Sequence, residues 1–216
     1  GPPQVDLAGV RGFRDGVIGR LTSGLAGLAK RRKVTVIRGH ARFTGPHSLT
    51  VSSGEAEAPL DLRFRQAIIA TGSEPIRLPF LPEDPRILDS TGALALETIP
   101  DRLLVIGGGI IGLEMAQVYL ALGAHVEIVE QASQIIPVAD ADLVAPLTRR
   151  IKDRCGALRL STRVSAVVAG ESLFVTFEGP KGQEEAEYDR ILVAIGRRPN
   201  GAACAPEAAE IGRAHV

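Results

Sequence analysis

Three glycines and one acid have the types and spacing that best suit a defined chemistry. Gly107, Gly109 and Gly112 form the pattern Gly-x-Gly-x-x-Gly, and Glu130 follows 18 residues after the last glycine. The first glycine permits a tight turn, the second lets the backbone approach a pyrophosphate, and the third lets a helix pack closely on a strand. An acid about twenty residues further on can bind the hydroxyls of an adenosine ribose. This spacing predicts a dinucleotide site.

The elements around these residues would hold them in place. Residues 103–106 are an apolar run ended by glycines, which is typical of a strand buried on both faces. Residues 110–122 repeat apolar side chains at helical spacing, and the start of that helix would offer N–H groups and a positive dipole end to phosphates. Residues 126–129 predict a second strand that ends at Glu130. A glycine-rich turn in another kind of α/β unit is the alternative.

The rest of the chain also contains patterns that are typical of helices and of strands. Apolar spacing predicts further helices, and β-branched runs between Gly, Pro and Asn predict further strands. We expect helices at 5–30, from Asp89 or Ser90 to 96, and at 143–154 behind an Asp142 cap. The expected strands are 34–37, 41–43, 48–51, 64–72, 158–160, 164–168, 173–177 and 190–195. Residues 74–90 are proline-rich and have the composition of a linker.

The sequence also repeats itself at an offset of 124 residues. Residues 48–51 are echoed by residues 172–175, and Ala70, Gly72 and Pro75 are echoed by Ala194, Gly196 and Pro199. Such a repeat predicts two related domains, each with a meander that leads into a strand ending Ala-x-Gly-x-x-Pro. Only the second copy opens with a glycine-rich strand–helix unit. Coincidence among common residue types is the alternative.

Composition excludes several classes of function. The 216 residues carry 25 Lys+Arg and 25 Asp+Glu, so nothing indicates a nucleic-acid partner. No uncharged apolar run reaches the length of a membrane span. We also expect no metal site. Cys155 and Cys204 lie far apart, which favours a reducing compartment, here the cytoplasm. The sequence opens on Gly1 rather than methionine, so we expect a fragment.

Several motifs together carry a resemblance to a known family. They agree in order and spacing, and they are residues 70–73, 107–115, 129–130, 136–137 and 192–200. With these motifs the chain resembles the flavin-dependent pyridine nucleotide–disulfide oxidoreductases. It is most similar to the branch that oxidises protein-bound dihydrolipoamide with NAD+. The resemblance implies FAD and NAD as cofactors. It also implies a homodimer that works in a 2-oxoacid dehydrogenase complex.

The resemblance implies an α/β fold of the Rossmann-like FAD/NAD(P)-binding type with a β-meander. It implies two related dinucleotide-binding domains, the first incomplete. Residues 1–75 would be the second half of an FAD domain, 76–90 a linker, 91–200 the NAD domain and 201–209 the return to the FAD domain. The implied NAD residues are Gly107, Gly108, Gly109, Ile110, Ile111, Gly112, Glu114, Glu130, Val164 and Gly196. The implied FAD residues are Ala41, Thr71, Gly72 and Ser73. Glu114 would lie near the nicotinamide, or it is simply an acid favoured in the first turn of a helix.

The sequence also departs from the family pattern. The first Gly-x-Gly-x-x-Gly, the Cys-x4-Cys redox pair and the C-terminal His–Glu pair are missing. Cys155 and Cys204 cannot form that redox pair, so we expect no catalytic residue in this chain. Residues 210–216 look like a non-native tail, unless they are an ordinary terminus. Two alternatives remain. One is an NADPH-linked disulfide or mercuric reductase, and the other is a nucleotide-binding module without turnover.

Overall fold

The computed structural model describes residues 5–54 and 58–212, and the chain divides into two compact units. The first unit holds residues 1–13 and 75–196, and the second holds residues 14–74 and 197–216. One boundary falls at residue 75 and the others fall after residues 13 and 196, so the segment 76–90, which the sequence predicts as a linker, belongs to the first unit. Residues 213–216 of the expected tail lie outside the described residues.

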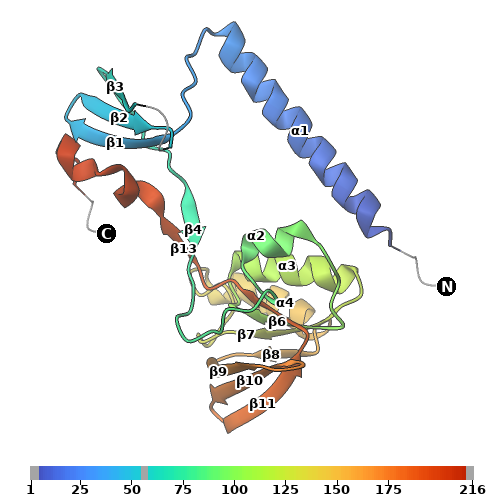
Figure 1. The fold of residues 1–216 in the computed structure, drawn as a ribbon. Coiled ribbons are helices and arrows are strands. Elements are labelled where there is room, and N and C mark those ends of the chain that lie inside the picture. The colour runs from blue at the N-terminus through green and yellow to red at the C-terminus, as the bar shows by residue number, and fades with distance from the viewer. Residues whose placement is uncertain (1–4, 55–57, 213–216) are drawn as a thin grey trace. The chain divides into compact units, whose positions relative to one another are not determined.

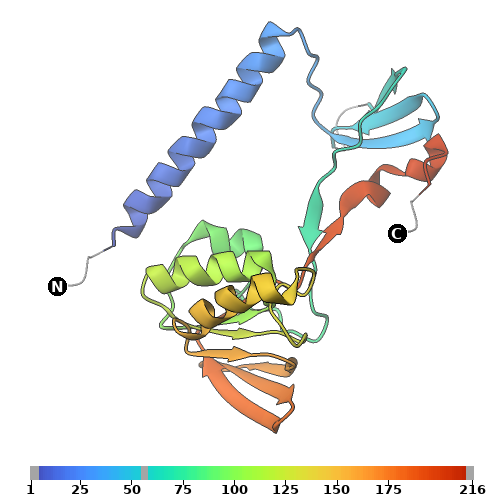
Figure 2. The ribbon, with the colours of Figure 1, turned by 180° about the vertical axis from the view of Figure 1, so that it is seen from behind.

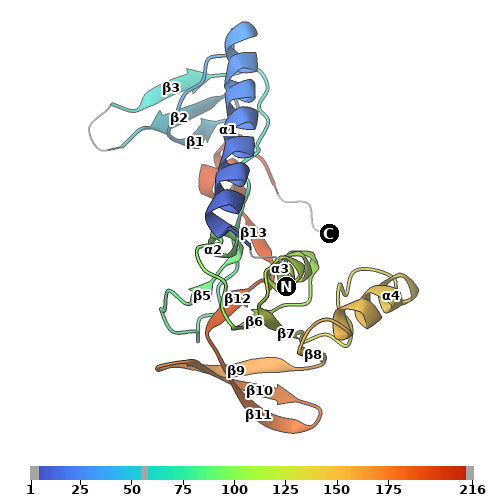
Figure 3. The same ribbon diagram turned by 90° about the vertical axis from the view of Figure 1, so that its right-hand side faces the viewer.

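The first unit is built on a five-stranded parallel sheet, with strands in the order β5-β12-β6-β7-β8. Figure 3 shows the five strands in this order. Their bounds are β5 Ile87–Leu88, β6 Arg102–Ile106, β7 His125–Val129, β8 Ala157–Arg159 and β12 Arg190–Val193. The predicted strands on either side of the glycine motif are therefore confirmed. Both are nearly all buried, as a parallel sheet covered on two faces requires.

Three helices cover one face of this sheet, and an antiparallel meander covers the other (Figures 1 and 2). The helices are α2 Ser90–Ala95, α3 Ile110–Ala121 and α4 Ala141–Lys152. The meander strands are β9 Arg163–Ala169, β10 Leu173–Gly179 and β11 Gly182–Tyr188. Successive β6 side chains point to opposite faces. Leu103 and Val105 join the core under the helices, and Leu104 and Ile106 join the core under the meander.

All four predicted helices are present, and each end lies within two residues of its predicted position. One predicted cap is wrong. Asp89 caps α2 by accepting hydrogen bonds from the backbone N–H groups of Thr91 and Gly92, both at 2.9 Å. The helix predicted at 143–154 begins at Ala141, so its N-cap is Asp140 and not Asp142. Asp142 lies in the first turn instead, where a carboxylate is also favoured.

The second unit contains a smaller meander and a two-stranded sheet. The meander strands are β1 His40–Gly45, β2 Ser48–Ser52 and β3 Leu60–Arg63, and the pair is β4 Ser73–Pro75 with β13 Arg197–Pro199. Two short 3-10 helices follow, η1 Asn200–Cys204 and η2 Pro206–Ala209. The predicted first helix is confirmed as α1 Leu7–Arg31, although it buries none of its residues. No helix among the described residues has the length and apolar character needed to cross a membrane.

Two predicted strands are wrong, and five strands were not predicted. Residues 34–37 and 64–72 form no strand. The missed strands are β3, β4, β5, β11 and β13, and β5 lies in the segment that was predicted to be a linker. In β11 only Tyr188 is buried, because this edge strand pairs on one side and is otherwise polar. Neither period-2 alternation nor a long apolar run therefore marked it in the sequence.

The 124-residue repeat is visible in the strands. Shifted by 124, β1 and β3 fall inside β9 and β11, β2 overlaps β10, and β4 coincides with β13. The same shift brings residues 34–37 onto β8 and residues 66–69 onto β12. In the first unit β8 pairs with β7, and β12 pairs with β5 and β6. In the part of the chain that the structure describes, no strand pairs with residues 34–37 or 66–69.

Candidate functional site

A cavity of about 910 Å3 opens where the parallel strands of the first unit end. Ile106 and Val129 are the last residues of β6 and β7, and Ala194 directly follows β12. Ligands of parallel α/β sheets bind outside the carboxyl ends of the strands. The other lining residues are Leu78, Phe80, Gly107, Gly109, Ile110, Ile111, Glu130, Gln131, Ile136, Pro137, Val138, Thr162, Arg163, Val164, Ile195 and Gly196.

The glycine turn gives each of its three glycines a separate task. Gly107 has a φ of +112°, and a Cβ there would stand 2.4 Å from the Ala194 carbonyl oxygen. Gly112 brings α3 against the turn, since a Cβ there would stand 2.1 Å from the Gly107 carbonyl oxygen. Gly109 is the N-cap of α3, and a Cβ there would meet nothing within 4 Å. The middle glycine therefore faces open space, as the pyrophosphate role requires.

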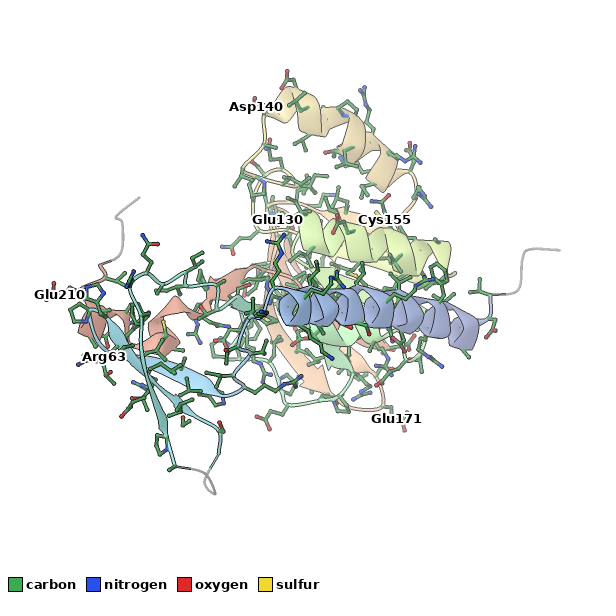
Figure 4. The ribbon with its side chains drawn as sticks, turned by 90° about the horizontal axis from the view of Figure 1, so that it is seen from above. Arg63, Glu130, Asp140, Cys155, Glu171 and Glu210 are labelled. Atoms are coloured by element: carbon green, nitrogen blue, oxygen red, sulfur yellow. The ribbon has the colours of Figure 1, made fainter. Side chains whose placement is uncertain are left out.

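Glu130 lies directly after β7, beside the start of α3 (Figure 4). Its two carboxylate oxygens accept hydrogen bonds from the backbone N–H groups of Gly108 and Ala132, both at 2.7 Å. A Cβ on Gly108 would stand 3.1 Å from the Cβ of Glu130, so only glycine leaves room for this side chain without crowding. Carboxylate bonds to backbone amides are charge-assisted and strong. The acid is thereby fixed at the edge of the glycine turn.

The loop after Glu130 forms a backbone hydrogen bond with the same glycine turn. Ile136 donates its backbone N–H to the Gly108 carbonyl at 2.9 Å and adopts the left-handed region, with φ +46°. The side chain of Ile135 is fully buried under the helices. Pro137 and Val138, which follow, line the cavity. Residues 136–137 are one of the motifs that carry the family resemblance, but their place in the cavity wall was not predicted, because the loop's shape depends on a backbone bond to a distant glycine.

The structure brings most of the predicted NAD residues together. Those that line the cavity are Gly107, Gly109, Ile110, Ile111, Glu130, Val164 and Gly196. Gly108 and Gly112 lie behind them in the turn and in α3. Glu114 is exposed on α3 and does not line the cavity. Lining residues that the sequence did not single out include Arg163, Ile195 and Phe80.

The predicted FAD residues belong to the second unit. Ala41 lies in β1 opposite Val51, with its side chain exposed. The carbonyl groups of Thr71 and Gly72 both accept hydrogen bonds from Asn200, at 3.3 Å and 3.0 Å. Ser73 accepts a hydrogen bond at Oγ from Arg197 Nε at 2.7 Å. Among the described residues of this unit, no glycine turn leads into an α-helix. The residues present therefore do not by themselves fit a flavin dinucleotide.

A buried acid on the parallel sheet, Glu127, forms a hydrogen bond with the meander. Glu127 on β7 is 7% exposed and accepts a hydrogen bond from the Tyr188 hydroxyl of β11 at 2.7 Å. Arg159 of β8 approaches the same carboxylate at 3.3 Å and lies over the Phe177 ring. Burial and the bond to Glu127 raise the pKa of the Tyr188 hydroxyl above its ordinary value. The cluster holds in place the meander, which supplies Val164 to the cavity wall.

Neither cysteine has the surroundings of a reactive thiol. Cys155 and Cys204 are both buried and free, and they belong to different units. Burial raises the pKa of the Cys155 thiol, and a raised pKa disfavours the reactive thiolate.

Comparison with known proteins identifies relatives over nearly the whole chain. The model of a family described as pyridine nucleotide-disulphide oxidoreductase matches residues 3–214. A dihydrolipoyl dehydrogenase of Vibrio parahaemolyticus is 53% identical over 204 residues, which are 93% of this chain and 42% of that protein. A dihydrolipoyl dehydrogenase of Haemophilus influenzae is 49% identical over 201 residues, again 42% of its own length. The chain thus spans less than half of the curated relatives that it matches.

Solved structures of similar fold were also found. The HOCl-induced flavoprotein disulfide reductase RclA from Escherichia coli superposes with a TM-score of 0.81 at 29% identity. The match covers 96% of this chain and 47% of that one. LpdA from Mycobacterium tuberculosis superposes with a TM-score of 0.83, and its 24% identity supports the fold alone.

Proposed function

Because this chain belongs to the pyridine nucleotide-disulphide oxidoreductase family, we propose that its cavity binds NAD(H). The pyrophosphate would lie at the glycine turn, where Gly109 leaves open space and α3 begins. The adenosine ribose would lie at Glu130. The first amides of a helix and its positive dipole end favour an anionic group at that place.

The observation that carries this proposal is the fixed carboxylate of Glu130. Backbone amides hold both of its oxygens at the edge of the turn, and each oxygen keeps a further lone pair for a ribose hydroxyl. The same negative charge would repel a phosphate on the 2′-oxygen. We therefore propose that NAD(H) is preferred over NADP(H).

Calorimetric titration of the purified chain with NAD+ and NADP+ tests the proposal. We expect NAD+ to bind more tightly, and Glu130→Ala to weaken its binding by about 1–3 kcal/mol. Glu114→Ala is the matched control, because Glu114 is exposed on α3 and does not line the cavity. Equal or tighter binding of NADP+ would contradict the proposal and favour an NADPH-linked relative. A loss in Glu114→Ala would restore the nicotinamide role for that residue.

For the whole protein we propose the activity of its curated relatives. It would be an FAD-dependent dihydrolipoyl dehydrogenase that oxidises protein-bound dihydrolipoamide with NAD+. It would act in the cytoplasm as a homodimer within a 2-oxoacid dehydrogenase complex. Identities of 53% and 49% to dihydrolipoyl dehydrogenases support this proposal.

We further propose that the chain as given binds NAD(H) but neither retains FAD nor oxidises dihydrolipoamide. Thr71, Gly72 and Ser73 offer too few contacts, and the cysteines are buried and apart. Supplied flavin would carry electrons between a disulfide and NAD+, and this sequence has no Cys-x4-Cys pair for that exchange. The test is the absorbance spectrum of the protein after incubation with FAD and desalting. A flavin band at a one-to-one ratio would refute the proposal.

A further inference from the structure

Two charged side chains line the cavity, and they have opposite signs. Among its described lining residues, Glu130 is the one acid and Arg163 is the one base. Glu130 already has a task in the proposed function. Arg163 has none, although its guanidinium is a good partner for a phosphate.

Arg163 stands on the same side of the cavity as Glu130. It directly follows Thr162, whose backbone N–H donates to the Glu130 carbonyl at 3.1 Å. Ser161 in turn donates to the Ala132 carbonyl at 2.9 Å. The connection between β8 and β9 is therefore bonded to the segment that carries Glu130. This arrangement places Arg163 near the ribose end of the proposed dinucleotide.

A second acid neutralises Arg163. Glu178 of β10 lies directly opposite Arg163 of β9 in the meander. Its Oε2 accepts hydrogen bonds from both Nε and Nη2 of Arg163, the first at 2.9 Å. The two side chains are 63% and 41% exposed, so the pair can open at little cost. With Glu178 in place, the uncompensated charge at this end of the cavity is the negative charge of Glu130.

We propose that Glu178 is a second determinant of dinucleotide choice, acting through Arg163. It holds the one cation of the cavity wall in an ion pair and so withholds it from a phosphate on the adenosine ribose. Removing the charge of Glu178 frees Arg163 to attract that phosphate. The inference rests on the proposed function, because it needs a dinucleotide in this cavity.

The test compares NAD+ and NADP+ binding by calorimetry in the whole chain and in three variants. In Glu178→Gln we expect the Kd for NADP+ to fall about two- to fivefold, the range of one exposed charge pair. The Kd for NAD+ should stay unchanged. The double variant Arg163→Gln/Glu178→Gln should lose the gain. Raising the salt to about 0.5 M should shrink the gain, because exposed charges are screened.

Glu185→Gln is the matched control. Glu185 is an exposed acid of the same meander, lies opposite Thr176 and does not line the cavity. An equal gain in this control would mean that net charge alone is responsible, which overturns the inference. Normal NAD+ binding with no NADP+ gain in Glu178→Gln overturns the inference alone. A chain that binds neither dinucleotide refutes the proposed function and the inference with it.

Discussion

Gly107 and Gly109 are two residues apart in one turn, yet the structure gives them different tasks. Gly107 needs its positive φ of +112° and the space beside the Ala194 carbonyl for the turn to form. Gly109 has an ordinary φ of −77° and open space where a side chain would be. The first glycine serves the fold, and under the proposed function the second serves the ligand.

Alanine at each position should separate these tasks. Gly109→Ala should leave the melting temperature unchanged and weaken NAD+ binding, because its methyl group points into the space proposed for the pyrophosphate. Gly107→Ala should lower the free energy of unfolding by about 1–3 kcal/mol or more, through backbone strain and the contact with Ala194. Differential scanning fluorimetry and calorimetry measure the two effects. A loss of stability in Gly109→Ala would contradict the assignment.

Where a spacing rule applies, the sequence predicted which residues lie together at the carboxyl ends of the parallel strands. Gly107, Gly109 and Glu130 all line the cavity as placed by their motif. The sequence could not show that Glu130 binds the Gly108 and Ala132 amides, or that Ile136 takes a left-handed conformation. Those features depend on contacts between segments that no local pattern encodes. Arg163 was missed for the same reason, since an isolated arginine in a strand carries no signal.

At the scale of elements, the joint between the parallel sheet and the meander depends on one buried acid. The Glu127 carboxylate is buried, and the Tyr188 hydroxyl and Arg159 are both directed at it. Tyr188 pairs with Leu173 at the end of the meander, so the bond ties β11 to β7. This contact therefore connects β11 with β7, which belong to different sheets and share no ladder hydrogen bonds.

Tyr188→Phe should weaken this joint by about 1–3 kcal/mol near neutral pH, because a buried carboxylate loses a donor. The folded pKa of Tyr188 is raised above its unfolded value near 10. Its contribution is therefore complete below about pH 10 and is lost as the pH rises through the folded pKa. Urea unfolding at about pH 8 and about pH 11 should show the advantage of the wild type shrinking at the higher pH. An advantage equal at both pH values would contradict this role.

The failed strand predictions have a physical cause at the same scale. Residues 34–37 and 66–69 have the composition of strands and match β8 and β12 in the repeat. Composition alone does not make a strand, because its backbone groups need a neighbouring strand to bond. Val34 and Ile68 are instead 57% and 95% exposed. The buried strands β6 and β7 were predictable because their partners are present.

For the whole molecule, the two units differ in how much apolar surface they bury. Both large core clusters lie in the first unit, between the sheet, its helices and its meander. In the second unit Phe43 and Val51 are buried in the meander, while Leu21 and Leu25 of α1 are 65% and 66% exposed. Each Å2 left exposed forfeits roughly 25 cal/mol of stabilisation.

Hydrogen exchange followed by mass spectrometry should resolve this difference. Peptides from residues 14–70 should exchange faster than peptides from residues 103–129, because the latter open only with the core of the first unit. The exposed apolar surface should also promote association, so the measurement needs a monomeric sample. Equal protection in the two segments would contradict the division into a well-buried and a poorly buried unit.

One further property follows from the pairing of β4 with β13. Residues 75–196 begin and end side by side, since Ile76 donates its backbone N–H to the Gly196 carbonyl at 3.1 Å. Next to them in the second unit, Arg197 Nε donates to Ser73 Oγ at 2.7 Å, where β4 pairs with β13. The segment 75–196 is thus inserted between two parts of the second unit, and its two ends are adjacent. Because this segment holds both core clusters, we expect it to fold when it is excised, and a short peptide linker would rejoin residues 74 and 197 in the paired strands β4 and β13.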